Sequence, residues 1–121
     1  MIEVLQGFPE GVVAFSAKGR VTRRDYDDVL IPKVREALAG DKSIRCYYEL
    51  GAAFSGMGAG AAWEDFKLGV EHLFSWKRVA VVTDVDWIRN AMTALRFMVP
   101  CEVQLFTTVQ TAEARKWICA D

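Results

Sequence analysis

The sequence predicts an α/β fold, a mixed sheet whose elements follow the order β-β-α-β-α-β-α-β-α. A turn cluster at Gly7 to Gly11 separates two short strand patterns, Ile2 to Gln6 and Val12 to Ala17, which indicates a hairpin that ends at Lys18. Strand and amphipathic helix patterns then alternate, as in βαβ units. The apolar run Val79 to Thr83 is typical of a parallel strand that is buried on both faces.

The first helix is expected from Arg23 to Ala39, with apolar residues recurring at three- and four-residue steps. Thr22 and Asp25 have the spacing of a capping box at its start. Pro32 lies inside the pattern, removes a hydrogen bond, and is expected to kink the helix or to split it in two. Gly40 is a suitable stop.

The later elements follow the same reasoning. Asp84 or Asp86 is expected to cap the helix that begins near Trp87, and Thr111 is expected to cap the last helix. Pro100 should end the helix that begins near Trp87. The other predicted elements are a third strand at Ile44 to Leu50, a second helix at about Gly60 to Phe74, and a last strand at Glu102 to Thr107.

Composition limits the classes of function. The chain has 121 residues, which predicts one domain covering residues 1–121. The net charge is −1, and Lys and Arg are scattered, so a nucleic-acid partner is not expected. The longest uncharged stretch, Leu50 to Trp63, is too short and glycine-rich to span a membrane. Three widely spaced cysteines (Cys46, Cys101 and Cys119) are typical of reduced thiols, which favours a cytoplasmic location.

A Gly/Ala-rich segment, Gly51 to Ala62, is predicted to be a loop after the third strand. It carries the apolar residues Phe54 and Met57, so it is a candidate for a mobile lid over a pocket. The alternative is that both side chains pack into the core. Gly56 to Ala61 also matches a dinucleotide-binding fingerprint, but the match is displaced from the expected strand end, and no cofactor is predicted.

Aromatic and ionisable residues near the predicted carboxyl edge suggest a ligand site. Trp63 and Trp87 could form an aromatic wall, while Asp65, His72 or Asp84 could orient a polar end. The alternative is helix–sheet packing for the tryptophans and a surface position for His72. No nucleophile–base pair and no set of metal ligands is apparent, so neither an enzyme nor a metal site is predicted.

The element order and several motifs together resemble the SpoIIAA-like family, whose members have a fold of the STAS and CRAL-TRIO type. The resemblance covers nearly the whole chain. The motifs that carry it are Gly19-Arg20-Val21-Thr22 with Asp25-Tyr26, Phe54-Ser55-Gly56, Trp63 to Gly69 with His72, Arg78 to Asp84 with Trp87, and Phe106 with Ala112-Glu113-Ala114 and Trp117.

This resemblance implies two functions. A CRAL-TRIO-type protein would hold an apolar or lipid-like ligand near membranes. Separately, the basic and apolar residues of the helix that begins near Trp87 could contact an anionic membrane surface, or its apolar residues could face the sheet and leave the arginines solvated. A STAS-type module of the anti-sigma-factor-antagonist kind would bind a protein partner. In such a module Ser55 would be the candidate phosphorylation switch, although Phe54 replaces the expected Asp. The apolar-ligand carrier is the leading hypothesis, the interaction module is the alternative, and a homodimer is a candidate assembly.

Overall fold

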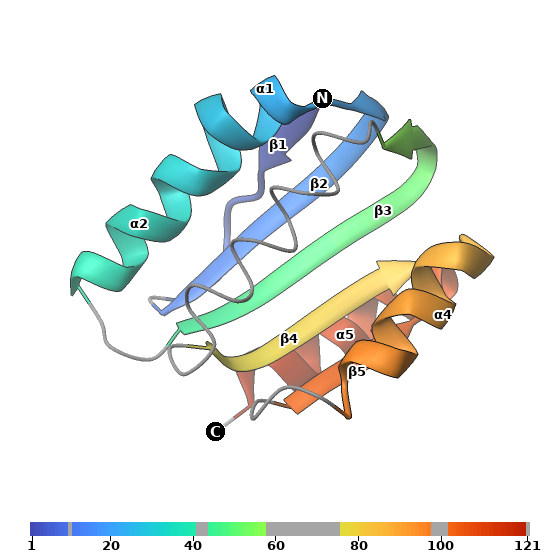
Figure 1. The fold of residues 1–121 in the computed structure, drawn as a ribbon. Coiled ribbons are helices and arrows are strands. Elements are labelled where there is room, and N and C mark those ends of the chain that lie inside the picture. The colour runs from blue at the N-terminus through green and yellow to red at the C-terminus, as the bar shows by residue number, and fades with distance from the viewer. Residues whose placement is uncertain (10, 41–43, 58–75, 98–101, 121) are drawn as a thin grey trace.

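Within the described residues, five strands form one sheet in the order β1-β2-β3-β4-β5 (Figure 1). The structure is a computed structural model that describes residues 1–9, 11–40, 44–57, 76–97 and 102–120. The strands β1 (Ile2–Val4) and β2 (Val12–Val21) pair antiparallel, which confirms the predicted hairpin. The strands β3 (Ile44–Met57), β4 (Trp76–Thr83) and β5 (Glu102–Phe106) continue the sheet in parallel from β2, so the predicted mixed sheet is confirmed.

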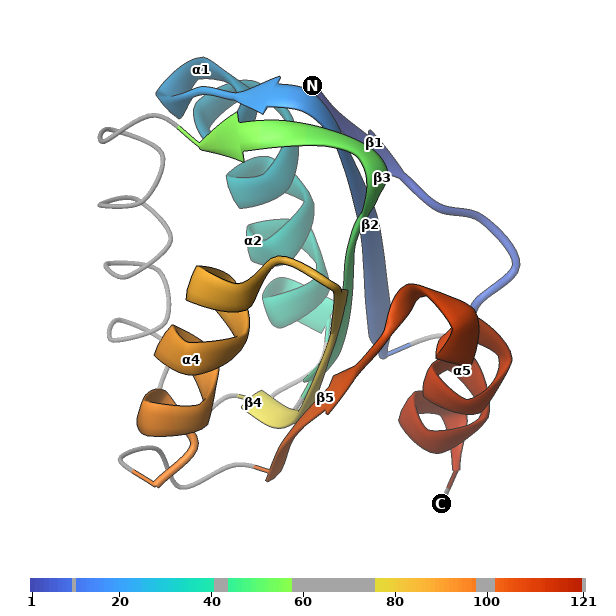
Figure 2. The same ribbon diagram turned by 90° about the vertical axis from the view of Figure 1, so that its right-hand side faces the viewer.

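Helices cover both faces of the sheet (Figure 2). On one face lie α1 (Arg23–Asp25), α2 (Ile31–Gly40) and α4 (Asp86–Leu95), and on the other lies α5 (Thr111–Cys119). The predicted helix at Gly60 to Phe74 and the predicted stop at Pro100 fall outside the described residues. β4 lies between two parallel neighbours, and Ala80 to Thr83 are buried, as its apolar run predicts.

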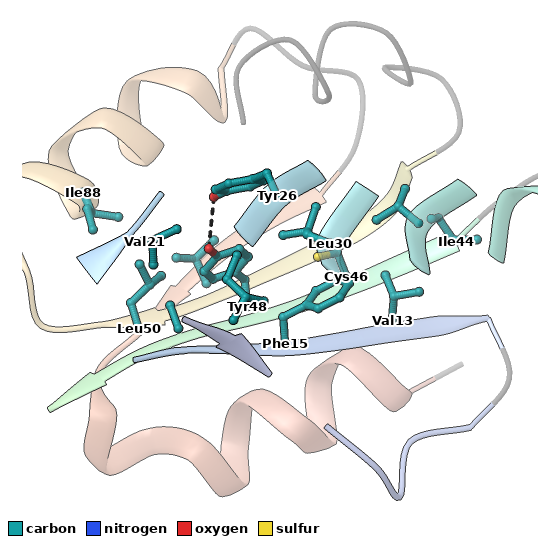
Figure 3. Close-up of a cluster of buried hydrophobic side chains, with 14 residues drawn as sticks. Val13, Phe15, Val21, Tyr26, Leu30, Ile44, Cys46, Tyr48, Leu50 and Ile88 are labelled. Carbon is teal, nitrogen blue, oxygen red and sulfur yellow. Dashed lines mark hydrogen bonds between the residues drawn. The ribbon is translucent and has the colours of Figure 1, made fainter. Parts of the chain in front are cut away.

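The larger core cluster lies between the sheet and the helical turn Tyr26–Leu30, α2 and α4 (Figure 3). Alternate residues of the strands, such as Phe15, Tyr48 and Leu50, point toward this face because successive strand side chains alternate. The hydroxyl groups of Tyr26 and Tyr48 lie 3.0 Å apart and form a buried hydrogen bond. This bond gives two large, otherwise apolar side chains a way to satisfy their polar ends within the core.

Pro32 does not split the helical run in two, as one of the two predicted outcomes would require, and the predicted kink stays a prediction. The chain runs from α1 through a π-helical turn, Tyr26–Leu30, directly into α2, and Pro32 is the second residue of α2. In this wide turn the Ile31 N–H donates to the Tyr26 carbonyl, five residues back. A proline ring normally clashes with the carbonyl four residues before it, and widening the preceding turn moves that carbonyl aside.

The predicted capping residues lie where the helical run begins. The Thr22 N–H donates to Asp25 Oδ2 at 2.8 Å, and the Thr22 hydroxyl donates to the same oxygen at 3.1 Å. Burial alone would raise the pKa of Asp25. The hydrogen bonds from Thr22 and the ammonium of Met1, 3.4 Å away, outweigh it and hold the pKa below its ordinary value. The carboxylate therefore ties the first turn to the end of β2.

The Gly/Ala-rich segment is not a loop as far as Met57, because β3 continues through it. β2 does not end at Lys18 either, so it supplies a partner: Gly19, Arg20 and Val21 pair with Phe54, Gly56 and Met57. From Leu50 to Phe54, β3 advances four residues while β2 advances two, from Ala17 to Gly19. Gly19 has φ +61, a conformation that glycine adopts without strain.

Small residues favour this irregular pairing because a bulged strand must bend, and they crowd the bend least. Figure 2 shows the ends of β2 and β3 curving together over the face that carries α1 and α2. β4 ends at Thr83, opposite Leu50, so within the described residues the rest of β3 pairs with β2 alone.

Two arginines hold the C-terminal end of α5 on the second face. Arg45 and Arg78 are neighbours in the parallel register of β3 and β4. Arg45 Nη1 donates to the carbonyls of Ile118 (2.9 Å) and Ala120 (2.7 Å), and Arg78 Nη1 donates to those of Trp117 (3.1 Å) and Ala120 (2.7 Å). These carbonyls belong to a helix end, where the helix leaves them without partners and the dipole favours positive charge.

We expect Arg78→Ala to lower the free energy of unfolding by about 2 kcal/mol, because it removes charged hydrogen bonds to two helix-end carbonyls. It also removes the Nε contact with Glu102 at 3.4 Å and the guanidinium over the Trp117 ring. Urea denaturation measures the change. Arg96→Ala is the control, since Arg96 is exposed and lies over the exposed ring of Phe97. An equal effect of both substitutions would contradict this role of Arg78.

Candidate functional site

The carboxyl ends of β4 and β5 lie at the same edge of the sheet because the two strands are parallel. Asp84 follows β4, and Thr108 begins the 3₁₀ turn Thr108–Gln110 after β5. The Thr108 N–H donates to Asp84 Oδ1 at 3.1 Å, and the Thr108 hydroxyl donates to Asp84 Oδ2. Two loops that are far apart in the sequence are therefore joined by a carboxylate that accepts two hydrogen bonds.

This link lowers the pKa of Asp84. The side-chain hydrogen bond from Thr108 has the largest effect on the pKa of Asp84, and the backbone hydrogen bond from Thr108 adds to it. The positive charge of Arg89 also contributes, so that the pKa lies below its ordinary value of 3.8 despite a small opposing effect of desolvation. At neutral pH the edge carries a fixed negative charge.

Arg89, in α4, also joins the carboxyl ends of β4 and β5. Its Nη1 donates to the carbonyl of Thr83 at 2.8 Å and to the carbonyl of Phe106 at 3.0 Å. The buried Thr83 hydroxyl accepts a hydrogen bond from the Val85 N–H at 3.1 Å. After β5, the Thr107 N–H donates to Gln110 Oε1 at 2.9 Å. Hydrogen bonds therefore fix the loops that follow β4 and β5 at this edge.

Two large apolar side chains are exposed at this edge of the sheet. Trp87, in the first turn of α4, is 54% exposed, and Val109, in the turn after β5, is 91% exposed. Trp87 is three residues from Asp84, and Val109 adjoins Thr108, so both flank the Asp84–Thr108 link. We call Asp84, Asp86, Trp87, Thr108 and Val109 the carboxyl-edge surface.

The structure places only some of the predicted ligand residues. Asp84 and Trp87 belong to the carboxyl-edge surface, whereas Trp63, Asp65 and His72 lie outside the described residues. Phe54, Ser55 and Met57 lie within β3, where Phe54 and Met57 pair with the end of β2 and Ser55 falls at the register shift between Gly19 and Arg20. The grouping of all seven ligand residues around one pocket stays a prediction, as does a switch at Ser55.

The predicted caps differ from those in the structure. Neither Asp84 nor Asp86 caps α4: Val85 precedes the helix and no side chain caps it, because the Asp84 carboxylate is engaged by Thr108. The turn before α5 starts earlier than expected, with the capping pair Thr107 and Gln110 in place of a cap at Thr111. The Thr-x-x-Gln spacing was the available signal for this earlier start.

A second polar cluster lies on the face of the sheet that α5 covers. The fully buried Tyr47 donates its hydroxyl hydrogen to Glu49 Oε1 at 2.8 Å. Burial and this bond raise the pKa of Tyr47 to about 12, even though the nearby Arg115 opposes the shift. The guanidinium carbon of Arg115 lies 5.1 Å from the centre of the Phe8 ring and 5.8 Å from that of Tyr47. Arg115 thus fixes α5 against the sheet and the β1–β2 turn.

Among the described residues, no three His, Cys, Asp or Glu side chains gather as a metal site would require. None of the helices described here has the length and apolar character needed to cross a membrane.

The family model for SpoIIAA-like proteins matches residues 12–119. The chain belongs to the SpoIIAA-like family. Its fold is similar to that of an uncharacterised protein with a SpoIIAA-like fold from Shewanella loihica PV-4, with a TM-score of 0.78 and 29% identity over 98% of this chain and 93% of the other. No curated protein matches this chain. Membership of this family supports, at the level of its fold, a regulatory or interaction module.

The Asp84–Thr108 link is testable through the pKa of Asp84. We expect Thr108→Val, which removes the hydroxyl donor, to raise this pKa toward 3.8 in a ¹³C NMR titration of the side-chain carboxyls. Because the folded pKa lies below the unfolded one, the link's contribution to stability is present at neutral pH and is lost as the pH falls through the folded pKa. Thr93→Val is the control, since the Thr93 hydroxyl donates to the Arg89 carbonyl within α4. A pKa that is the same in both variants would contradict the link.

Proposed function

We propose that the protein is a non-enzymatic interaction module that binds a protein partner through the carboxyl-edge surface. The observation that carries this proposal is the exposure of Trp87 beside loops fixed by the Asp84–Thr108 and Arg89 hydrogen bonds. Tryptophan is enriched among the residues that dominate binding energy at protein interfaces. A surface whose loops are already fixed loses little conformational entropy when a partner binds.

The size of the effect is sufficient for recognition. A tryptophan side chain has an accessible area on the order of 250 Å², of which 54% is exposed here. At about 25 cal/mol per Å², covering that part would contribute at most about 3 kcal/mol, from which the entropic cost of association is subtracted. Val109 would add to this contribution because its exposed fraction, 91%, is higher still.

The alternative hypothesis, a carrier of an apolar or lipid-like ligand, has less support. Among the residues expected to line its pocket, the structure describes the side chain of Trp87. That side chain is 54% exposed to solvent. The loop expected as its lid is strand as far as Met57. Ligand uptake and membrane contact therefore stay predictions, while the exposed apolar side chains favour a docking surface.

Site-specific photo-crosslinking tests the proposal. With p-benzoylphenylalanine in place of Trp87, we expect irradiated cells to yield a discrete adduct, whose partner is then identified and purified. The same residue in place of Phe97 is the matched control, because Phe97 is 84% exposed but follows the opposite end of α4. Trp87→Ala should weaken binding of the purified partner by roughly 30- to 100-fold, with the fold retained by circular dichroism.

The control variant Phe97→Ala should bind the partner like the unmodified protein. The proposal is wrong if position 87 yields no adduct, or if Trp87→Ala and Phe97→Ala affect the affinity equally. An adduct of two copies of this chain would identify a homodimer as the complex that this surface forms.

A further inference from the structure

We infer that the partner segment recognised by the carboxyl-edge surface carries an apolar side chain next to lysine or arginine. This inference rests on the proposed function and specifies the chemistry of its partner. It follows from the charges around Trp87 and Val109 and from how the nearest arginine on α4 is engaged.

Two carboxylates, Asp84 and Asp86, belong to the carboxyl-edge surface, and a third, Glu113, accepts a hydrogen bond from Gln110 of the turn that carries Val109. Asp84 ends the β4 side, Asp86 is in the first turn of α4, and Glu113 is in the first turn of α5. All three are exposed. Within the part of the chain that the structure describes, none of them forms an ion pair with a basic side chain. Both oxygens of Asp84 accept hydrogen bonds from Thr108, and Glu113 accepts one from Gln110 at 3.4 Å, so among the described residues Asp86 is the carboxylate of the three that makes neither a hydrogen bond nor an ion pair. The neutral donors Thr108 and Gln110 leave the negative charges of the other two uncompensated.

Arg89 does not offer its charge to a partner in the same way. Its guanidinium donates to the carbonyls of Thr83 and Phe106 and is only partly exposed. The outward charge of the surface is accordingly negative. Phosphate groups of nucleic acids or anionic membranes would be repelled by it, whereas lysine and arginine side chains would be attracted.

Trp87 adds a second reason for a basic partner. The face of an indole ring attracts ammonium and guanidinium groups, and arginine also stacks on it. Asp86 lies in the same first turn of α4 as Trp87, and Asp84 lies three residues before Trp87, so a long basic side chain over the ring would be attracted by the negative charge of both. An adjacent apolar side chain of the partner would cover Val109. The arrangement thus selects a segment that is both basic and apolar.

Selection from a library of short random peptides displayed on phage tests the inference, with the full chain as the immobilised target. We expect peptides that bind the unmodified chain and Phe97→Ala, but not Trp87→Ala, to be enriched in Lys or Arg next to an apolar residue. The best peptide, synthesised with a fluorescent label, should bind about three- to tenfold more weakly to the double variant Asp86→Asn/Glu113→Gln. Its affinity should also fall as salt is raised.

This double variant removes charge but leaves the Asp84–Thr108 link and the Arg89 hydrogen bonds intact. The inference is overturned if the selected peptides are acidic or uncharged, if the double variant binds them as tightly as the unmodified chain, or if no peptide depends on Trp87. A crosslinked partner at position 87 combined with any of these results would leave the proposed function standing and would refute the basic segment alone. Absence of both the adduct and Trp87-dependent peptides would refute both proposals.

Discussion

Parallel pairing of β2 through β5 is the constraint on which the rest of the structure depends, because it gives the sheet two chemically different edges. At the amino edge the register brings Arg45 beside Arg78, and together they hold the end of α5. At the carboxyl edge the same register brings the loops after β4 and β5 together, where Asp84 meets Thr108. The amino edge therefore holds α5 on the sheet, and the carboxyl edge exposes side chains to solvent.

Polar contacts add to apolar burial in fixing the elements around both edges. α5 buries Ala114 and Ile118 and packs Trp117 and Cys119 against the sheet. Arginines also hold it at Phe8 and Tyr47 and at its C-terminal carbonyls. Arg89 does the same for the strand ends beneath α4. Planar guanidinium groups suit this task because they donate to several carbonyls in fixed directions. The exposed Trp87 thus rests on a rigid base although it adds little to the core.

Much of the fold could be predicted from the sequence, since hydrophobic periodicity and the Thr22–Asp25 pair are local signals. The extension of β3 could not, because Gly and Ala have low strand propensity and the pairing with Gly19 to Val21 depends on distant residues. Asp84 and Trp87 could be placed at the correct edge by the rule for parallel strands. Their partner Thr108 could not, because a contact across 24 residues leaves no local pattern.

The π-helical turn changes the direction in which successive side chains point from the first helical segment. Tyr26, Leu30 and Val34 are all buried, yet they recur every four residues, a step that overshoots one turn of an ideal α-helix by about 40°. A turn closed by a five-residue hydrogen bond undershoots over the same step, so the wide turn between Tyr26 and Leu30 offsets the overshoot between Leu30 and Val34. One widened turn thereby keeps three side chains in line along the sheet and accommodates Pro32 immediately after it.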